Sequence, residues 1–129
     1  MKSKKFSLSI LPEKLAIFHL SKKSPIPSWV LEGNEFFSIT QTPDEISVVC
    51  AQDKIRPGIL AEKDWRALKV QGPLGFSLTG IVASLSKPLA ESKISILYIS
   101  TYETDYILVE EKNLEKAIEV LSDFCDIKR

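Results

Sequence analysis

Residues 72–80 are the stretch of this sequence best suited to hold a small anion. They place Ser77 and Thr79 among Gly72, Gly75 and Gly80. A glycine-rich bend lets backbone N–H groups approach a ligand closely, and a helix that follows directs its positive end to the same place. A carboxylate suits such a site. The alternative is an ordinary strand-to-helix turn capped by Ser77, and the residues alone leave both interpretations open.

A second polar stretch, residues 100–106, interrupts two apolar runs. Asp105 lies where a strand is expected, and aspartate is disfavoured in strands. Its carboxylate could receive an ammonium group. Equally, Asp105 could be a turn residue that bonds to nearby backbone, which is the usual role of aspartate in loops.

Enzymatic chemistry has little support in the sequence. His19 is the only histidine, and it lies in a strand run with no nucleophile paired to it, so we expect it to be structural. No cysteine–histidine cluster has metal-ligand spacing, and no cofactor is expected. Residues 72–80 lack the Lys-Ser or Lys-Thr of a Walker loop. They also lack the arginine that an acylphosphatase would need at this turn.

Hydrophobic periodicity indicates the elements that would position these residues. The expected hairpins join residues 6–11 to 14–20, 36–41 to 45–51, and 94–102 to 104–110. We expect a short helical turn around Trp29, a connector over residues 52–63 and a strand over 65–71. A helix is expected over residues 78–92, with a kink at Pro88 because proline lacks the N–H that the Ser84 carbonyl would accept.

A last amphipathic helix is predicted to begin after Asn113, which would cap it. Its expected buried face consists of Leu114, Ala117, Ile118, Leu121 and Phe124, which recur at helical spacing. From residue 65 onward the order is therefore strand, helix, strand, strand, helix. This is the α+β, ferredoxin-like order short of its last strand. Either a strand from the first half of the chain or residues 126–129 could supply it.

The sequence also contains a weak internal repeat. Residues 39–49 align with residues 99–109. In this alignment Glu45 corresponds to Asp105, and the apolar ends of the two segments coincide. Two hairpins of the same topology could match by chance, but duplication explains the match better. The first half keeps the strands and has almost no helix-forming sequence.

Charge and cysteine content narrow the class of protein. The chain has 129 residues, with 17 basic and 17 acidic side chains, and this balance argues against a nucleic-acid partner. Nothing resembles a signal peptide or a membrane span, so we expect a cytoplasmic protein with no membrane partner. Cys50 and Cys125 are expected to be buried thiols rather than a disulfide.

In the glycine-rich stretch 72–80 and the polar stretch 100–106, the sequence resembles the small double-ACT proteins. The resemblance runs from about residue 6 to residue 121. Its most specific pieces are FSIT (37–40), EISVVC (45–50), WRALKVQGPL (65–74), FSLTGI (76–81) and ISTYETDYILV (99–109). The sequence is also similar to the ACT modules at the regulatory end of aspartate kinases and to the arginine-sensing CASTOR proteins.

The resemblance implies two tandem ACT-like βαββαβ units with antiparallel sheets, the first of them degenerate. The corresponding division of the chain is residues 1–63 and 64–129. In this family amino acids bind where ACT units meet, next to the turn after a first strand and the edge of a neighbouring hairpin. Carried over, the implied ligand-binding residues are Gly72, Leu74, Gly75, Phe76, Ser77, Leu78, Thr79, Gly80, Ile81, Ser100, Thr101, Tyr102, Thr104 and Asp105. The family pattern has an acid where this chain has Gly75, which gives Asp105 more weight.

The expected function is a non-enzymatic regulatory or sensory module that binds a free amino acid. Backbone amides near residues 75–80 would hold the α-carboxylate, Asp105 would take the α-ammonium, and Thr101 or Tyr102 would shape the side-chain pocket. A homodimer is expected, with a separate effector protein to carry the output. The alternatives are a ligand-free protein–protein interaction module and an acylphosphatase-type enzyme.

Overall fold

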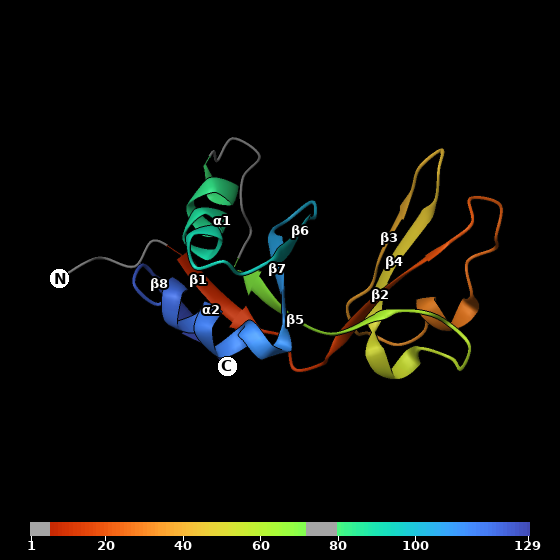
Figure 1. The fold of residues 1–129 in the computed structure, drawn as a ribbon, viewed down its shortest axis with the longest axis horizontal. Coiled ribbons are helices and arrows are strands. Elements are labelled where there is room, and N and C mark those ends of the chain that lie inside the picture. Colours follow the sequence, from red (N-terminus) through yellow and green to blue (C-terminus); the bar gives the residue numbers. More distant parts are fainter. Residues whose placement is uncertain (1–5, 72–79) are drawn as a thin grey trace. The chain divides into compact units, whose positions relative to one another are not determined.

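The computed structural model describes residues 6–71 and 80–129 of the chain. In chain order its elements are β1 (Phe6–Ile10), β2 (Leu15–Leu20), η1 (Ser28–Leu31), β3 (Ser38–Gln41), β4 (Ile46–Ala51), η2 (Gln52–Lys54), β5 (Glu62–Val70), α1 (Ile81–Glu91), β6 (Ile96–Ser100), β7 (Asp105–Glu110), η3 (Glu111–Asn113), α2 (Leu114–Leu121) and β8 (Cys125–Lys128) (Figure 1). They form two compact units. The smaller unit is Glu13–Trp65, and the larger unit combines the chain up to Pro12 with Arg66–Arg129.

The larger unit has the strand order β8, β1, β5, β7, β6. The pairs β1–β5 and β6–β7 are antiparallel, whereas β1 and β8 run parallel. From β5 onward the chain therefore follows the ferredoxin-like order of strand, helix, two strands, helix and strand. The expected last strand is β8, but β1, from the first half of the chain, occupies the position beside β5. Both candidate sources of the missing strand thus contribute.

The predicted hairpin between residues 6–11 and 14–20 is wrong. Both segments are strands, but β1 pairs with β5 and β8, whereas β2 pairs with β4 and β5. Burial explains the separation, because Leu8 of β1 belongs to the core of the larger unit and Phe18 of β2 to that of the smaller unit. A short Pro-Glu link therefore joins two strands that belong to different cores.

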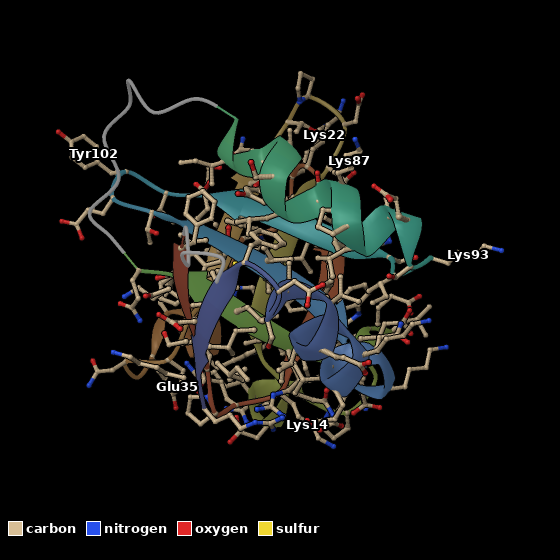
Figure 2. The ribbon with its side chains drawn as sticks, turned by 90° about the vertical axis from the view of Figure 1, so that its left-hand side faces the viewer. Lys14, Lys22, Glu35, Lys87, Lys93 and Tyr102 are labelled. Atoms are coloured by element: carbon tan, nitrogen blue, oxygen red, sulfur yellow. The ribbon has the colours of Figure 1, made fainter. Side chains whose placement is uncertain are left out.

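Both helices pack on one face of the larger unit's strands. Leu85 and Leu89 of α1 are fully buried with Ile107 and Val109 of β7, and α2 adds to the same core the predicted face of Leu114, Ala117 and Leu121. Ile118 and Phe124 are partly buried against it. Figure 2 shows α1 lying over the β6 and β7 strands. α1 runs through Pro88 to Glu91, and Asn113 precedes α2 without a side-chain capping bond.

The smaller unit, all of whose residues are described, follows the same order without α-helices. Its strands lie in the order β3, β4, β2, β5, with three antiparallel pairs. The short 3₁₀ turns η1 and η2 stand where a full ACT-like unit has helices. Val30 of η1 is buried with Phe18, and Trp29 stacks on the Phe18 ring at 5.7 Å. The predicted helical turn at Trp29 and the scarcity of helix in the first half are confirmed.

The β3–β4 and β6–β7 hairpins are built in the same register. Ile39 faces Val48 as Tyr98 faces Ile107, and Gln41 faces Ile46 as Ser100 faces Asp105. The structure therefore contains the predicted repeat, but the strand pairing shifts the correspondence between the two hairpins by one residue from the sequence alignment. Asp105 corresponds to Ile46, not to Glu45. The displacement matters because moving one step along a strand exchanges its two faces.

Cys50 and Cys125 are both buried, as predicted, and neither forms a disulfide; burial raises the pKa of the Cys50 thiol. Over residues 6–71 and 80–129, neither helix is long and apolar enough to cross a membrane.

Candidate functional site

The turn between β6 and β7 is closed by Thr101. The Thr101 amide donates to the Thr104 carbonyl at 2.7 Å, and the Thr104 amide donates to the Thr101 hydroxyl oxygen at 3.2 Å. Ser100 is exposed at the end of β6. Tyr102 is 80% exposed at the tip of the turn and projects away from the strands (Figure 2). Tyr102 is thus accessible to a ligand or a partner at the tip of the turn.

Thr104 anchors this turn to β5. Its side chain is buried, with 4% of its surface exposed, and its hydroxyl donates to the carbonyl of Val70, the last residue of β5. Gly72, the first residue of the glycine-rich segment, follows Val70 closely in the sequence. The hydrogen bond therefore fixes the β6–β7 turn beside the point where the chain enters residues 72–79.

Replacing Thr104 by Val should test this anchor. Valine keeps the shape of the side chain but leaves the Val70 carbonyl without that donor, so the free energy of unfolding should fall by about 1–3 kcal/mol. Urea denaturation measures the change. The matched control is Thr40→Val, at an exposed position of β3. The control should change the stability by no more than about 0.5 kcal/mol. Equal effects of the two substitutions would show that the anchor contributes nothing of its own.

Asp105 is half-buried and bonded to Tyr98. The Tyr98 hydroxyl donates to Oδ2 of Asp105 at 2.7 Å, across the β6–β7 pair. Burial, together with this hydrogen bond and the negative charge of Asp105, raises the pKa of Tyr98 well above its usual value. The phenol therefore remains a donor at physiological pH. One carboxylate oxygen is committed to Tyr98, while the other, Oδ1, accepts no hydrogen bond from the described part of the chain.

The equivalent hairpin of the smaller unit has no such polar pair. In the shared register, Tyr98 and Asp105 correspond to Ile39 and Ile46, and Ile46 is buried with only 3% exposed. Both isoleucines pack in the core of the smaller unit. A hydrogen-bonded phenol and carboxylate thus stand where the related hairpin buries hydrocarbon. Placing a charge at a core-facing position costs stability unless the charge is hydrogen-bonded, so this pair calls for an explanation beyond folding.

Gly80 and Ile81 begin α1. Gly80 has a φ of 77° and directly precedes the first helical residue. This left-handed conformation favours glycine. Ile81 is partly buried against the core of the larger unit. The remaining predicted residues lie outside the described residues. They are Gly72, Leu74, Gly75, Phe76, Ser77, Leu78 and Thr79.

Side chains elsewhere in the described part of the chain do not assemble a comparable site. His19 is an exposed residue of β2. Over residues 6–71 and 80–129, no group of three or more His, Cys, Asp or Glu side chains could hold a metal ion. Hollows of about 490 Å³ each that are lined by described residues include one in the smaller unit beside Lys14 and Asp53 and one between the ends of α1 and α2. Neither of these is lined by a predicted site residue.

Sequence reasoning missed Tyr98. In the sequence it is one of three tyrosines spaced by four positions, and this spacing has no meaning in a hairpin. The useful signal is the strand register. Tyr98 and Ser100 share one face of β6 because side chains alternate along a strand, and Asp105 lies opposite Ser100. A phenol and a carboxylate on diagonal positions of the same face are within reach of each other.

The match to known families covers both units. A family model described as the ACT domain matches residues 60–123, and a model for an N-terminal domain matches residues 13–57. The protein Atu0741 from Agrobacterium tumefaciens has a solved structure that is 36% identical in sequence; the match covers 97% of this chain and 93% of that one, with a TM-score of 0.89. The chain belongs to the ACT domain family.

Two other proteins resemble this ACT protein, one in sequence and one in fold. The cytosolic arginine sensor for mTORC1 subunit 1 from Bos taurus is 36% identical over 106 residues, which cover 74% of this chain and 32% of the sensor. The chain thus spans about a third of the length of this sensor. The regulatory subunit of aspartate kinase from Thermus thermophilus has the same fold, with a TM-score of 0.64 at 12% identity, covering 95% of this chain and 99% of that one.

The ACT match includes the polar pair. Residues 60–123 span β5 to α2 and so contain the anchored turn, Tyr98 and Asp105. Within the ACT fold, the turn and the pair therefore lie in the unit that retains both helices. The smaller, helix-poor unit has Ile39 and Ile46 instead.

Proposed function

We propose that this ACT protein is a non-enzymatic regulatory module that binds a free amino acid. The site consists of residues 72–81, the β6–β7 turn from Ser100 to Thr104, and Asp105. Backbone amides near Gly75 and Gly80, with the hydroxyls of Ser77 and Thr79, hold the α-carboxylate of the ligand. Asp105 takes its α-ammonium group, and Thr101 and Tyr102 border the ligand's side chain.

The observation that carries this proposal is the half-buried carboxylate of Asp105. It occupies a position that is apolar in the related hairpin of the same chain. Its oxygen Oδ2 accepts the hydrogen bond from Tyr98, and its other oxygen, Oδ1, accepts none from the described part of the chain. An ammonium ion bonded to a partly buried carboxylate forms a charge-assisted hydrogen bond, worth about 1.5–3 kcal/mol net. The Thr104 anchor supports the location, because it ties the turn to the end of β5 directly before the glycine-rich segment.

A thermal-shift screen of the purified protein against the twenty amino acids tests the proposal. Arginine is the first to try, because the Bos taurus relative is named as an arginine sensor. A ligand present at about 100 times its dissociation constant should add about 2.7 kcal/mol of stability. If no amino acid shifts the melting temperature at millimolar concentration, the proposed site does not exist.

The output of such a module passes through other proteins. We propose a cytoplasmic homodimer that presents its liganded form to a separate effector. Light scattering coupled to gel filtration measures the mass directly. A dimer is expected to have twice the 14.5 kDa mass of one chain, whereas a mass that stays at the single-chain value at all concentrations excludes it.

A further inference from the structure

We infer that Tyr98 is a positioning residue of the amino-acid site, which holds the Asp105 carboxylate in the orientation that receives the ligand's ammonium group. The inference rests on the proposed function. It adds a residue that does not touch the ligand and acts through Asp105.

The ring of Tyr98 is fixed by packing. Tyr98 is partly buried against the core of the larger unit, and it lies on the face of β6 whose neighbour across the pair, Ile107, is fully buried. A tyrosine has few rotatable bonds, so a packed ring leaves its hydroxyl in one place. The 2.7 Å hydrogen bond then transfers this rigidity to the carboxylate of Asp105.

Without Tyr98, the Asp105 side chain would have few constraints. Asp105 is the first residue of β7, at the end of the hairpin, and its partner in register, Ser100, is exposed. Within the described part of the chain, its carboxylate is held by the bond from Tyr98. An aspartate at such a position has several accessible rotamers, and only some of them direct Oδ1 to a given point. Fixing one rotamer in advance lowers the entropy that ligand binding must remove.

The paired difference from the other hairpin supports a joint role. Ile39 and Ile46 occupy the two equivalent positions in the smaller unit, so both members of the pair are polar in one hairpin and apolar in the other. A phenol placed here only to fill space would not need its hydroxyl. A carboxylate placed here only to close the turn would not need a buried donor, because the turn is already closed by Thr101.

The test compares Tyr98→Phe with the wild-type protein on two ligands. The probes are L-arginine and 5-guanidinopentanoate, which keeps the carboxylate and the guanidinium but lacks the α-ammonium. If the screen identifies another amino acid, that amino acid and its α-hydroxy acid replace them. Isothermal titration calorimetry measures both affinities.

A positioning role predicts a selective loss. Tyr98→Phe should weaken binding of the amino acid about three- to tenfold, since the free carboxylate loses its fixed orientation, and it should leave the affinity for the ligand without the ammonium unchanged. Equal weakening of both ligands would mean that Tyr98 only maintains the fold, and unchanged affinity for both would mean that Asp105 needs no support. Either result overturns the inference. Failure of the wild-type protein to bind any amino acid overturns the proposed function instead, and the inference with it.

Discussion

Replacing Asp105 by Asn should remove most of the stabilisation that an amino acid gives this protein, without unfolding it. Asparagine has nearly the same shape and keeps an oxygen that can accept a hydrogen bond, as Asp105 accepts one from Tyr98. What it loses is the negative charge that would face the ligand's ammonium. A charge-assisted hydrogen bond is worth about 1.5–3 kcal/mol, so the affinity should fall about tenfold to 100-fold.

Thermal shift across a range of ligand concentrations measures this effect, and the melting temperature without ligand reports on the fold. Asp105→Ala should abolish the shift in the same way, at some additional cost in stability because Tyr98 loses its acceptor. An amino-acid-induced shift that is unchanged in both variants would remove Asp105 from the site.

The hairpin of the smaller unit suggests a stricter control. The double variant Tyr98→Ile and Asp105→Ile recreates the pair Ile39 and Ile46 in the larger unit. Replacing a buried polar pair by hydrocarbon is often neutral or stabilising, so the double variant should fold at least as well as the wild type. Its melting temperature should also remain unchanged when any amino acid is added. Retained binding by this variant would contradict a ligand site centred on the pair.

The largest effect on stability is expected for Leu85→Ala. Leu85 lies on α1 with no exposed surface, in contact with the core shared by both helices and by β1, β5 and β7. Truncating a fully buried leucine leaves a cavity as well as losing transferred surface, and the cost is typically about 2–5 kcal/mol. A loss of this size is a large fraction of the stability of a small domain.

Val82 provides the control on the same helix, since 49% of its surface is exposed. Val82→Ala removes methyl groups that are already half in water, and alanine favours the helix more than valine does, so the change should stay within about 0.5 kcal/mol. Urea unfolding followed by circular dichroism gives both values. Comparable losses for the two variants would mean that α1 does not bury the face assigned to it.

The sequence was sufficient for structure whose causes are local. The hairpins at residues 36–51 and 94–110 can be predicted because each joins two β-rich segments across a short polar turn, and both turns are closed by a threonine, Thr42 and Thr101. The two helices follow from apolar residues at helical spacing. The ACT family follows from long matching segments.

The partners of β1 could not be predicted in the same way. The link at Pro12 and Glu13 resembles a hairpin turn, and local chemistry does not reveal that the strands on its two sides enter different cores. β1 pairs with β5 and β8, which lie in the second half of the chain. Pairing at such distances is decided by which core each strand completes.

The alignment of the repeat failed for a related reason. It matched residues by type, acid to acid, whereas hydrogen-bonded register places Asp105 opposite Ser100 and therefore in the position of Ile46. Because Glu45 and Asp105 are both acids, the alignment paired them and did not show that Asp105 replaces the apolar Ile46. Tyr98 was missed with it, because its partner is evident only in the correct register.

The position of β1 affects the order in which the chain can fold. As the ribosome releases the protein, the smaller unit can form as soon as β5 has emerged, but β1 must wait with its apolar residues, Leu8 among them, until the rest of the larger unit has been made. Contacts so distant in sequence slow folding and leave a strand edge open in the meantime. A fragment that starts at residue 64 would keep α1, α2, Tyr98 and Asp105 and still lack the strand between β5 and β8. β1 is thus synthesised before the smaller unit but is among the last strands to pair with its neighbours.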